Sequence, residues 1–193
     1  YLIINAKPNK VKRTNELTPA AQYLLLFHLQ TDGIDNWSIN QIKAHIADYN
    51  YIALTRAIVC LENAGLCKTE KDSKKEKHII FDCSHKELWE KAQPFLISPI
   101  KKILYCDTFP KGDFIQSGVS ALVHYTNINP DDLITLAVTD KEYRNIEAQL
   151  KIYGLNPVEG RIRIEIWQYP AIINGLLLNN YVDKLSLYLT LKD

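Results

Sequence analysis

The chain lacks several features that would assign it to a class of protein at once. It has no methionine, so every spacing below takes the printed neighbours as covalent neighbours. It has no apolar run long enough to cross a membrane, and the apolar residues 1–4 are too few for a signal peptide. Its four cysteines include no Cys-x-x-Cys pair. We therefore expect free thiols, no membrane contact and a cytoplasmic location.

Charge of one sign is also missing. The chain has 23 Lys and Arg against 22 Asp and Glu, which gives a net charge of +1. A uniformly basic surface for nucleic acid is therefore excluded, and any basic footprint must be local. With 193 residues, 47% hydrophobic and 23% charged, the chain can form one or two ordinary globular domains.

Motifs of common enzymes are absent, since the chain has no Gly-rich phosphate loop and no nucleophile elbow. The carboxylate pairs Asp131–Asp132 and Asp140–Glu142 lie at turns or helix starts, where capping explains them. His124 beside Tyr125 is better explained as a helix histidine with a hydrogen-bond partner than as an acid or base. We predict no enzyme activity and no cofactor, although a deep pocket joining His124 to a carboxylate would reopen the question.

Metal-binding residue types are present but poorly spaced. Cys83 and His85 lie close in sequence, and His78, Cys67 and Cys60 precede them. This order fits no common zinc motif, and Cys60 falls on a helix that is expected to be buried on one side. We therefore expect no metal site.

The first half of the chain predicts three helices and a hairpin. Helices are expected to begin at Thr18, Ser38 and Tyr51, the second with a Ser–Gln capping box. Two short strands, 67–71 and 77–82, follow around a polar turn. Helix, helix, helix, hairpin is the order of a winged helix-turn-helix.

The third helix of this half carries the main functional prediction. Leu54, Ile58 and Leu61 recur at helical spacing and should point inward. The residues expected to contact DNA lie on its outer face, at the start of the helix before it, or on the lysine-rich hairpin: Ser38, Gln41, Lys43, Asn50, Tyr51, Thr55, Arg56, Lys68, Lys71, Lys74, Lys75 and Lys77. For the hairpin, interleaved acids make a solvated turn an equally good explanation.

The second half mixes strands and helices. Strands are expected at 99–107, 133–138 and 161–169, and helices at 117–125, from Thr139 to about Tyr153, and at 183–191. The fold class predicted is α+β, with an arm at 1–16, a winged helix-turn-helix domain at 17–97 and a smaller α+β domain at 98–193.

The last of these strands alternates strictly. Ile162, Ile164 and Ile166 should form a dry face, and the opposite face, with Arg161, Arg163, Glu165, Trp167 and Tyr169, should be wet. Trp, Tyr and Arg together are typical of interface anchors, so this face predicts a homodimer or a cognate protein partner. Burial of Trp167 under a local helix is the alternative.

Two resemblances add to this pattern. Residues 38–66 resemble the helix-turn-helix of MarR-like winged-helix regulators, through Asn50 to Ile58 and the Leu61–Leu66 ending. They depart at Val59 and Cys60, where basic residues are common in that family. Ser117 to Leu122, followed by Tyr125, is similar to the "SG-x-SAL" helix of AbiEi-type antitoxin regulators.

These resemblances imply a DNA-binding transcriptional regulator, with double-stranded DNA as partner. The second one implies an antitoxin-like autorepressor of its own operon. The alternative is a protein-interaction module whose winged helix no longer binds DNA, which Val59, Cys60 and the low net charge favour.

Overall fold

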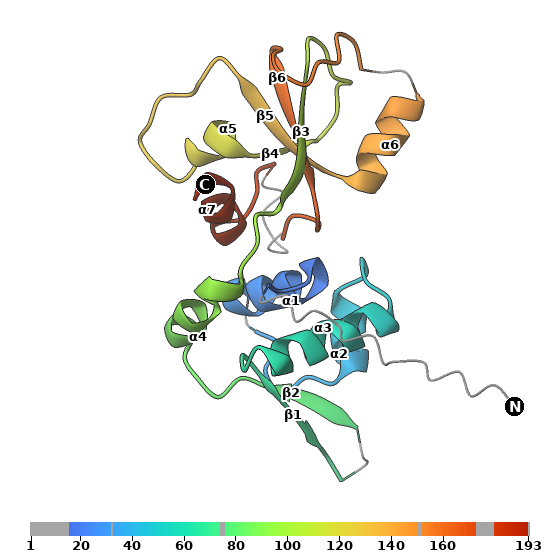
Figure 1. Cartoon of the computed structure of the whole chain (residues 1–193), viewed down its shortest axis with the longest axis vertical. Coiled ribbons are helices and arrows are strands. Elements are labelled where there is room, and N and C mark those ends of the chain that lie inside the picture. Colours follow the sequence, from blue (N-terminus) through green and yellow to red (C-terminus); the bar gives the residue numbers. More distant parts are fainter. Residues whose placement is uncertain (1–15, 32, 74–75, 150–151, 173–179, 193) are drawn as a thin grey trace, which may run out of the picture.

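The computed structural model describes residues 16–31, 33–73, 76–149, 152–172 and 180–192. The expected arm at 1–16 lies outside this part except for Glu16, and Lys74 and Lys75 lie outside it too. The described chain is of mixed α and β structure, which confirms the α+β class. We refer to residues 16–97 as the N-terminal half and to residues 98–192 as the C-terminal half (Figure 1).

The N-terminal half contains helices and one hairpin in the expected order. Its elements are α1 (Pro19–Gln30), α2 (Ile39–His45), α3 (Tyr51–Asn63), β1 (Lys68–Lys71), β2 (Lys77–Ile80) and α4 (His85–Ala92), followed by a short 3-10 turn, η1 (Gln93–Phe95). Side chains of Thr18, Ser38 and Asn50 each cap the helix that follows. Gly65, with φ of 69°, ends α3 in the left-handed conformation that glycine adopts readily.

The helix starts predicted from the caps are therefore confirmed, and so are the inward faces. Leu54, Ile58 and Leu61 of α3 are buried, as are Ile39 and Ile42 of α2. The hairpin is antiparallel, and β2 also pairs with the segment before α2, where Ser38 forms a bridge with His78. This pairing ties the hairpin to the start of α2.

The C-terminal half is built on one sheet of four strands in the order β3-β6-β5-β4. These are β3 (Ile100–Cys106), β4 (Ile115–Gln116), β5 (Ile134–Thr139) and β6 (Ile162–Trp167). β5 and β6 are parallel, joined through helix α6 (Asp140–Ala148), as a parallel pair requires a crossover. Figure 1 shows α6 on one side of the sheet, and α5 (Gly118–Leu122) and α7 (Lys184–Leu191) on the other.

Two helices are shorter than predicted. The helix expected over 117–125 is regular only over Gly118–Leu122, and the one expected to reach Tyr153 ends at Ala148. Tyr153 instead forms a bridge with Thr108, beyond the end of β3, and the amide of Tyr105 donates to the carbonyl of Asn156. The segment around Tyr153 and Asn156 therefore forms hydrogen bonds along the free edge of β3 instead of continuing helix α6.

The wet face predicted for β6 is wrong. Glu165, Trp167 and Tyr169 are 1%, 2% and 1% exposed, and Ile164 and Ile166 of the isoleucine face are buried as expected, with Ile162 half-buried. Strand β6 lies between β3 and β5, and helices lie on both sides of the sheet, so both faces of the strand are buried from Ile164 to Trp167, while its first two residues are half-buried. Trp167 and Tyr169 thus do not anchor an external partner.

The two halves instead share one apolar core. Trp167 and Tyr169 belong to the same buried cluster as the leucines of α1, and the ring of Tyr169 meets the ring of Tyr23 edge to face. The buried side chain of Gln22 donates to the Tyr169 hydroxyl and to the carbonyl of Ile97. Helix α1 is therefore buried on both sides, by the N-terminal helices below and the C-terminal half above (Figure 1).

The structure bears on two expectations from the sequence, free thiols and the absence of a membrane span. The cysteines are all free, at positions 60, 67, 83 and 106. Within the ranges described above, no helix combines the length and the apolar character needed to cross a membrane.

Candidate nucleic-acid interface

The outer face of α3 begins with the residues chosen from the sequence. Because Leu54, Ala57, Ile58 and Leu61 are buried, the period of the helix turns Tyr51 and Arg56 to solvent and leaves Thr55 half-buried. The Thr55 hydroxyl donates to the Tyr51 carbonyl at 2.8 Å. Arg56 makes no ion pair with any described residue, so its guanidinium is available to a partner.

The same face carries two exposed apolar side chains. Ile52 is 61% exposed and Val59 is 45% exposed, beside Tyr51 at 52%. The sequence already showed Val59 at a position where MarR-like regulators commonly have a basic residue. The same helical period could have placed Ile52 on the exposed face. The face of α3 is therefore mixed, with one cation among three large apolar groups.

Several residues predicted to touch DNA have structural roles. Ser38 is 2% exposed, and its hydroxyl accepts from the amide of Gln41, whose side chain accepts from the amide of Ser38. The Asn50 side chain accepts from the amide of Ala53 at 2.8 Å. Ser38 thus offers no free hydroxyl surface. Asn50 can form a bidentate pair with adenine only by giving up its cap, because the cap uses its side-chain oxygen.

Some of the lysines predicted to contact DNA have a partner within the described chain, and others do not. Lys43 is half-buried and donates to the carbonyl of Ala47, and Lys68 is paired with the carboxylate of Asp82. Lys71 and Lys77 are exposed, make no ion pair with a described residue and lie directly opposite each other in the hairpin register. Like charges on opposed strand positions are destabilising. An anionic group of a partner that lies between the two lysines would relieve their repulsion.

One group of side chains on the hairpin has the composition of a metal site. Ligand atoms of Asp72, Glu76 and His78 lie within 4.8 Å of one another. The Nδ1 atom of His78 lies 2.9 Å from the Asn36 carbonyl, and Nε2 lies 3.5 Å from the Asp72 carboxylate. The pKa of His78 is raised, first by the hydrogen bond to the Asn36 carbonyl and then by the neighbouring Asp72 carboxylate. An ion pair between His78 and Asp72 therefore accounts for this arrangement.

The cysteine–histidine set considered from the sequence does not assemble in the same way. Within the described ranges, the cluster on the hairpin is the one group of three metal-binding side chains, and it contains only His78 of that set. Cys67 is buried, its thiol faces the carbonyl of Ile58, and burial raises its pKa to about 12. A thiol held protonated in this way is a poor ligand.

Three of the groups considered for catalysis, His124, Asp140 and Glu142, each have a structural partner. Nε2 of His124 lies 3.1 Å from the side-chain oxygen of Gln116, and its ring stacks on Tyr181. Asp140 pairs with Lys101, and Glu142 completes the cap of α6. These contacts supply no proton-transfer pair.

The small residues behind the second resemblance also have local roles. The hydroxyl of Ser117 donates to the buried carboxylate of Glu165 at 2.6 Å. Gly118 has φ of 53°, and a Cβ there would lie 3.2 Å from Thr135. This motif therefore holds α5 to the sheet, whatever else it does.

Comparisons of this chain with protein-family models, with curated proteins and with solved structures found no match.

Proposed function

We propose that this chain is a DNA-binding transcriptional regulator with a winged helix-turn-helix in its N-terminal half. In this proposal α3 enters the major groove and the β1–β2 hairpin acts as the wing on flanking phosphates. The observation that carries it is the exposure of Tyr51 and Arg56 on the first two turns of α3, with Thr55 half-buried beside them. The arginine can pair with a guanine edge, and tyrosine and threonine can contact phosphates.

Local charge supports the same proposal. Arg56 on α3 and the opposed Lys71 and Lys77 on the hairpin are cations without an ion-pair partner in the described chain. The chain as a whole has a net charge of only +1. Binding would therefore rest on few phosphate contacts and should show a modest salt slope.

An autorepressor role follows from the second resemblance as part of the proposal. The binding site would then lie upstream of the chain's own gene, and a homodimer would require a palindrome with half-sites about 34 Å apart. With Trp167 and Tyr169 buried, a dimer or a cognate protein would have to use other surfaces of the C-terminal half.

A gel shift on the chain's own upstream DNA tests the proposal. Arg56→Ala should weaken specific binding by about 1–3 kcal/mol, or about 5- to 150-fold. Arg144→Ala is the matched control, since Arg144 is an exposed arginine on α6 in the other half. Equal affinity of wild type and a folded Arg56→Ala variant would remove α3 as the reading element.

A second function is favoured by one specific observation, the exposed apolar groups of α3. Ile52, Val59 and Tyr51 form a surface that suits a protein partner better than a phosphate backbone. If α3 binds protein, Ile52→Ser with Val59→Ser should abolish association in sedimentation experiments, while Arg56→Ala should have little effect. The reverse ranking in the gel shift supports DNA.

A further inference from the structure

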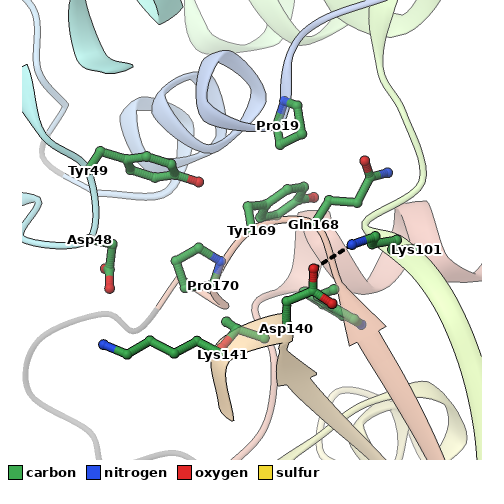
Figure 2. A pocket seen from close by; sticks show the side chains of 11 residues that line it. Pro19, Asp48, Tyr49, Lys101, Asp140, Lys141, Gln168, Tyr169 and Pro170 are labelled. Atoms are coloured by element: carbon green, nitrogen blue, oxygen red, sulfur yellow. Dashed lines mark hydrogen bonds and ion pairs between the residues drawn. The ribbon is translucent and has the colours of Figure 1, made fainter. Parts of the chain in front are cut away.

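A cavity of about 470 Å³ lies between the two halves, at the carboxyl ends of the parallel strands β5 and β6. The N-terminal half contributes Pro19, Asp48 and Tyr49, and Figure 2 shows them opposite Asp140 and Lys141. Ligands of sheets with parallel strands commonly bind beyond these carboxyl ends. We refer to this cavity as the inter-half cleft, and its volume suits a small metabolite.

Two aspartates and two lysines line the cleft, so its net charge is zero, but only one aspartate and one lysine form an ion pair with each other. Lys101 and Asp140 form an ion pair, drawn as a dashed line in Figure 2. Asp48 and Lys141 form no ion pair with any described residue. Figure 2 shows both on the same side of Pro170, one reaching in from each half. Both side chains are exposed to solvent, and a ligand that pairs with both would carry one positive and one negative group.

The remaining wall is flat and mostly apolar. Pro19, Pro170 and the ring of Tyr49 line it, with Trp167 and Tyr169 buried behind them. The Tyr49 hydroxyl is shielded from solvent and has no hydrogen-bond partner in the described chain. Burial raises the pKa of this hydroxyl, so it stays protonated behind the apolar wall and adds no charge to the cleft.

We propose that the inter-half cleft binds a free α-amino acid with an apolar side chain. Its ammonium group would face Asp48, its carboxylate would face Lys141, and its side chain would lie against the two prolines. Neutral net charge of the lining and the two unpaired charges favour a zwitterion over a simple anion or cation.

The position of the cleft also assigns it a regulatory role, which rests on the proposed DNA-binding function. Asp48 and Tyr49 form the turn between α2 and α3, directly before the cap residue Asn50. An amino acid held by Asp48 on one side and Lys141 on the other links this turn to the C-terminal sheet. Occupation of the cleft should therefore change the affinity of α3 for DNA, by at least about fivefold.

Calorimetry on the full chain tests the site without reference to DNA. L-phenylalanine and L-leucine should bind, and two analogues of phenylalanine that lack one charge, 3-phenylpropanoate and 2-phenylethylamine, should bind at least about tenfold more weakly. Absence of heat with both amino acids up to about 10 mM would overturn the site. Equal binding of either analogue would overturn the zwitterion class.

Two variants make the test specific to the cleft. Lys141→Gln should lose the preference of the protein for L-phenylalanine over 2-phenylethylamine, and Asp48→Asn should lose its preference over 3-phenylpropanoate. Lys102→Gln is the matched control, because Lys102 is an exposed lysine on β3 that does not line the cleft. Wild-type affinities in both cleft variants would place the ligand elsewhere and overturn the assignment.

A gel shift with and without saturating L-phenylalanine then tests regulation. A change of at least about fivefold in DNA affinity, absent in Lys141→Gln, supports it. Ligand binding with unchanged DNA affinity overturns the regulatory role alone. If no DNA is bound in either condition, the proposed function and its regulation fail together, while the calorimetry still decides the amino-acid site.

Discussion

The helices α2 and α3 of the N-terminal half bury one face each, whereas the central strand β6 of the C-terminal half buries both faces from Ile164 to Trp167. On α3, Leu54 is fully buried while Ile52, two residues away, is 61% exposed. On β6, Ile164 and its neighbour Glu165 are both buried, at 0% and 1% exposed. A helix at the surface keeps one side for a partner, but a strand with neighbours on both edges and helices on both faces keeps none.

The halves also differ in the polar groups that they bury. In the N-terminal half these are Gln22, His28 and Ser38, each held by hydrogen bonds. In the C-terminal half they include the carboxylates Glu165 and Asp183. Buried charge depends on its partners far more than a buried amide or neutral imidazole does, so the C-terminal half should be the more sensitive to loss of one polar side chain.

The largest expected effect tests this contrast at Glu165. Its carboxylate accepts from the Ser117 hydroxyl at 2.6 Å and from the Trp167 indole at 3.2 Å, and pairs with Arg163 at 3.2 Å. Glu165→Ala leaves these groups without an acceptor and should lower the free energy of unfolding by about 3–5 kcal/mol. Urea denaturation measures this loss.

Glu159→Ala provides the control for that measurement, since Glu159 is an exposed acid in the loop before β6 and its side chain makes no ion pair with a described residue. Its unfolding free energy should stay within about 0.5 kcal/mol of wild type. If Glu165→Ala also lowered the unfolding free energy by less than about 0.5 kcal/mol, the Glu165 face of β6 would be exposed to solvent.

The next effect concerns His28 in the N-terminal half. Burial, with His85 adding to it and Asp35 opposing it, lowers the His28 pKa to about 4, against about 6.5 in an unfolded chain. Below about pH 6.5 the unfolded chain takes up a proton that the folded chain refuses until about pH 4, so stability falls across that window as pH falls. From pH 7 to pH 5 the loss should be about 2 kcal/mol.

His28→Asn is the variant that isolates this titration. Asparagine can still accept from the amide of Ile34, as Nδ1 of His28 does at 3.1 Å. The variant should be less stable at pH 7 because it loses the ring that stacks on Phe81, but its stability should fall less between pH 7 and pH 5. A pH dependence identical to wild type would assign the titration to other groups.

A smaller effect separates the structural role of Asn50 from its proposed role at DNA. Asn50→Ala removes the cap of α3 and should cost about 1 kcal/mol of unfolding free energy. Asn50→Asp keeps the cap, so thermal unfolding should change little, while its negative charge should weaken DNA binding. Wild-type DNA affinity of Asn50→Asp would restrict Asn50 to capping.

The smallest effect sharpens the comparison within α3 itself. Ile52→Ala should change the unfolding free energy by less than about 0.5 kcal/mol, because the side chain is mostly in solvent. Leu54→Ala, its matched partner on the buried face, should cost about 2–5 kcal/mol. Comparable losses for the two variants would show that Ile52 is covered in solution.

Features that depend on neighbours along the chain could be predicted from the sequence. The caps at Thr18, Ser38 and Ser84 follow from side chains that reach amides three residues away. Outward placement of Tyr51 and Arg56 follows from the helical period that buries Leu54 and Ile58. Lys68, Lys71 and Lys77 of the hairpin are exposed as expected, but their spacing did not reveal that Lys68 pairs with an acid while the other two form no ion pair with a described residue.

Features that depend on distant segments could not be predicted in this way. Alternation along 161–169 fixes which side chains share a face, but burial of that face depends on β3, β5 and the helices that cover them. The end of α6 depends on the open edge of β3, whose backbone groups bind the segment around Tyr153.

The sequence by itself determined the α+β class, the order of elements and the two faces of α3, because caps, turns and hydrophobic period act over a few residues. Only the tertiary structure decided that Trp167 and Tyr169 join the halves, and that Asp48 and Lys141, 93 residues apart in the sequence numbering, line one cleft. Those arrangements follow from packing of a whole core, in which long-range contacts set what each local pattern is packed against.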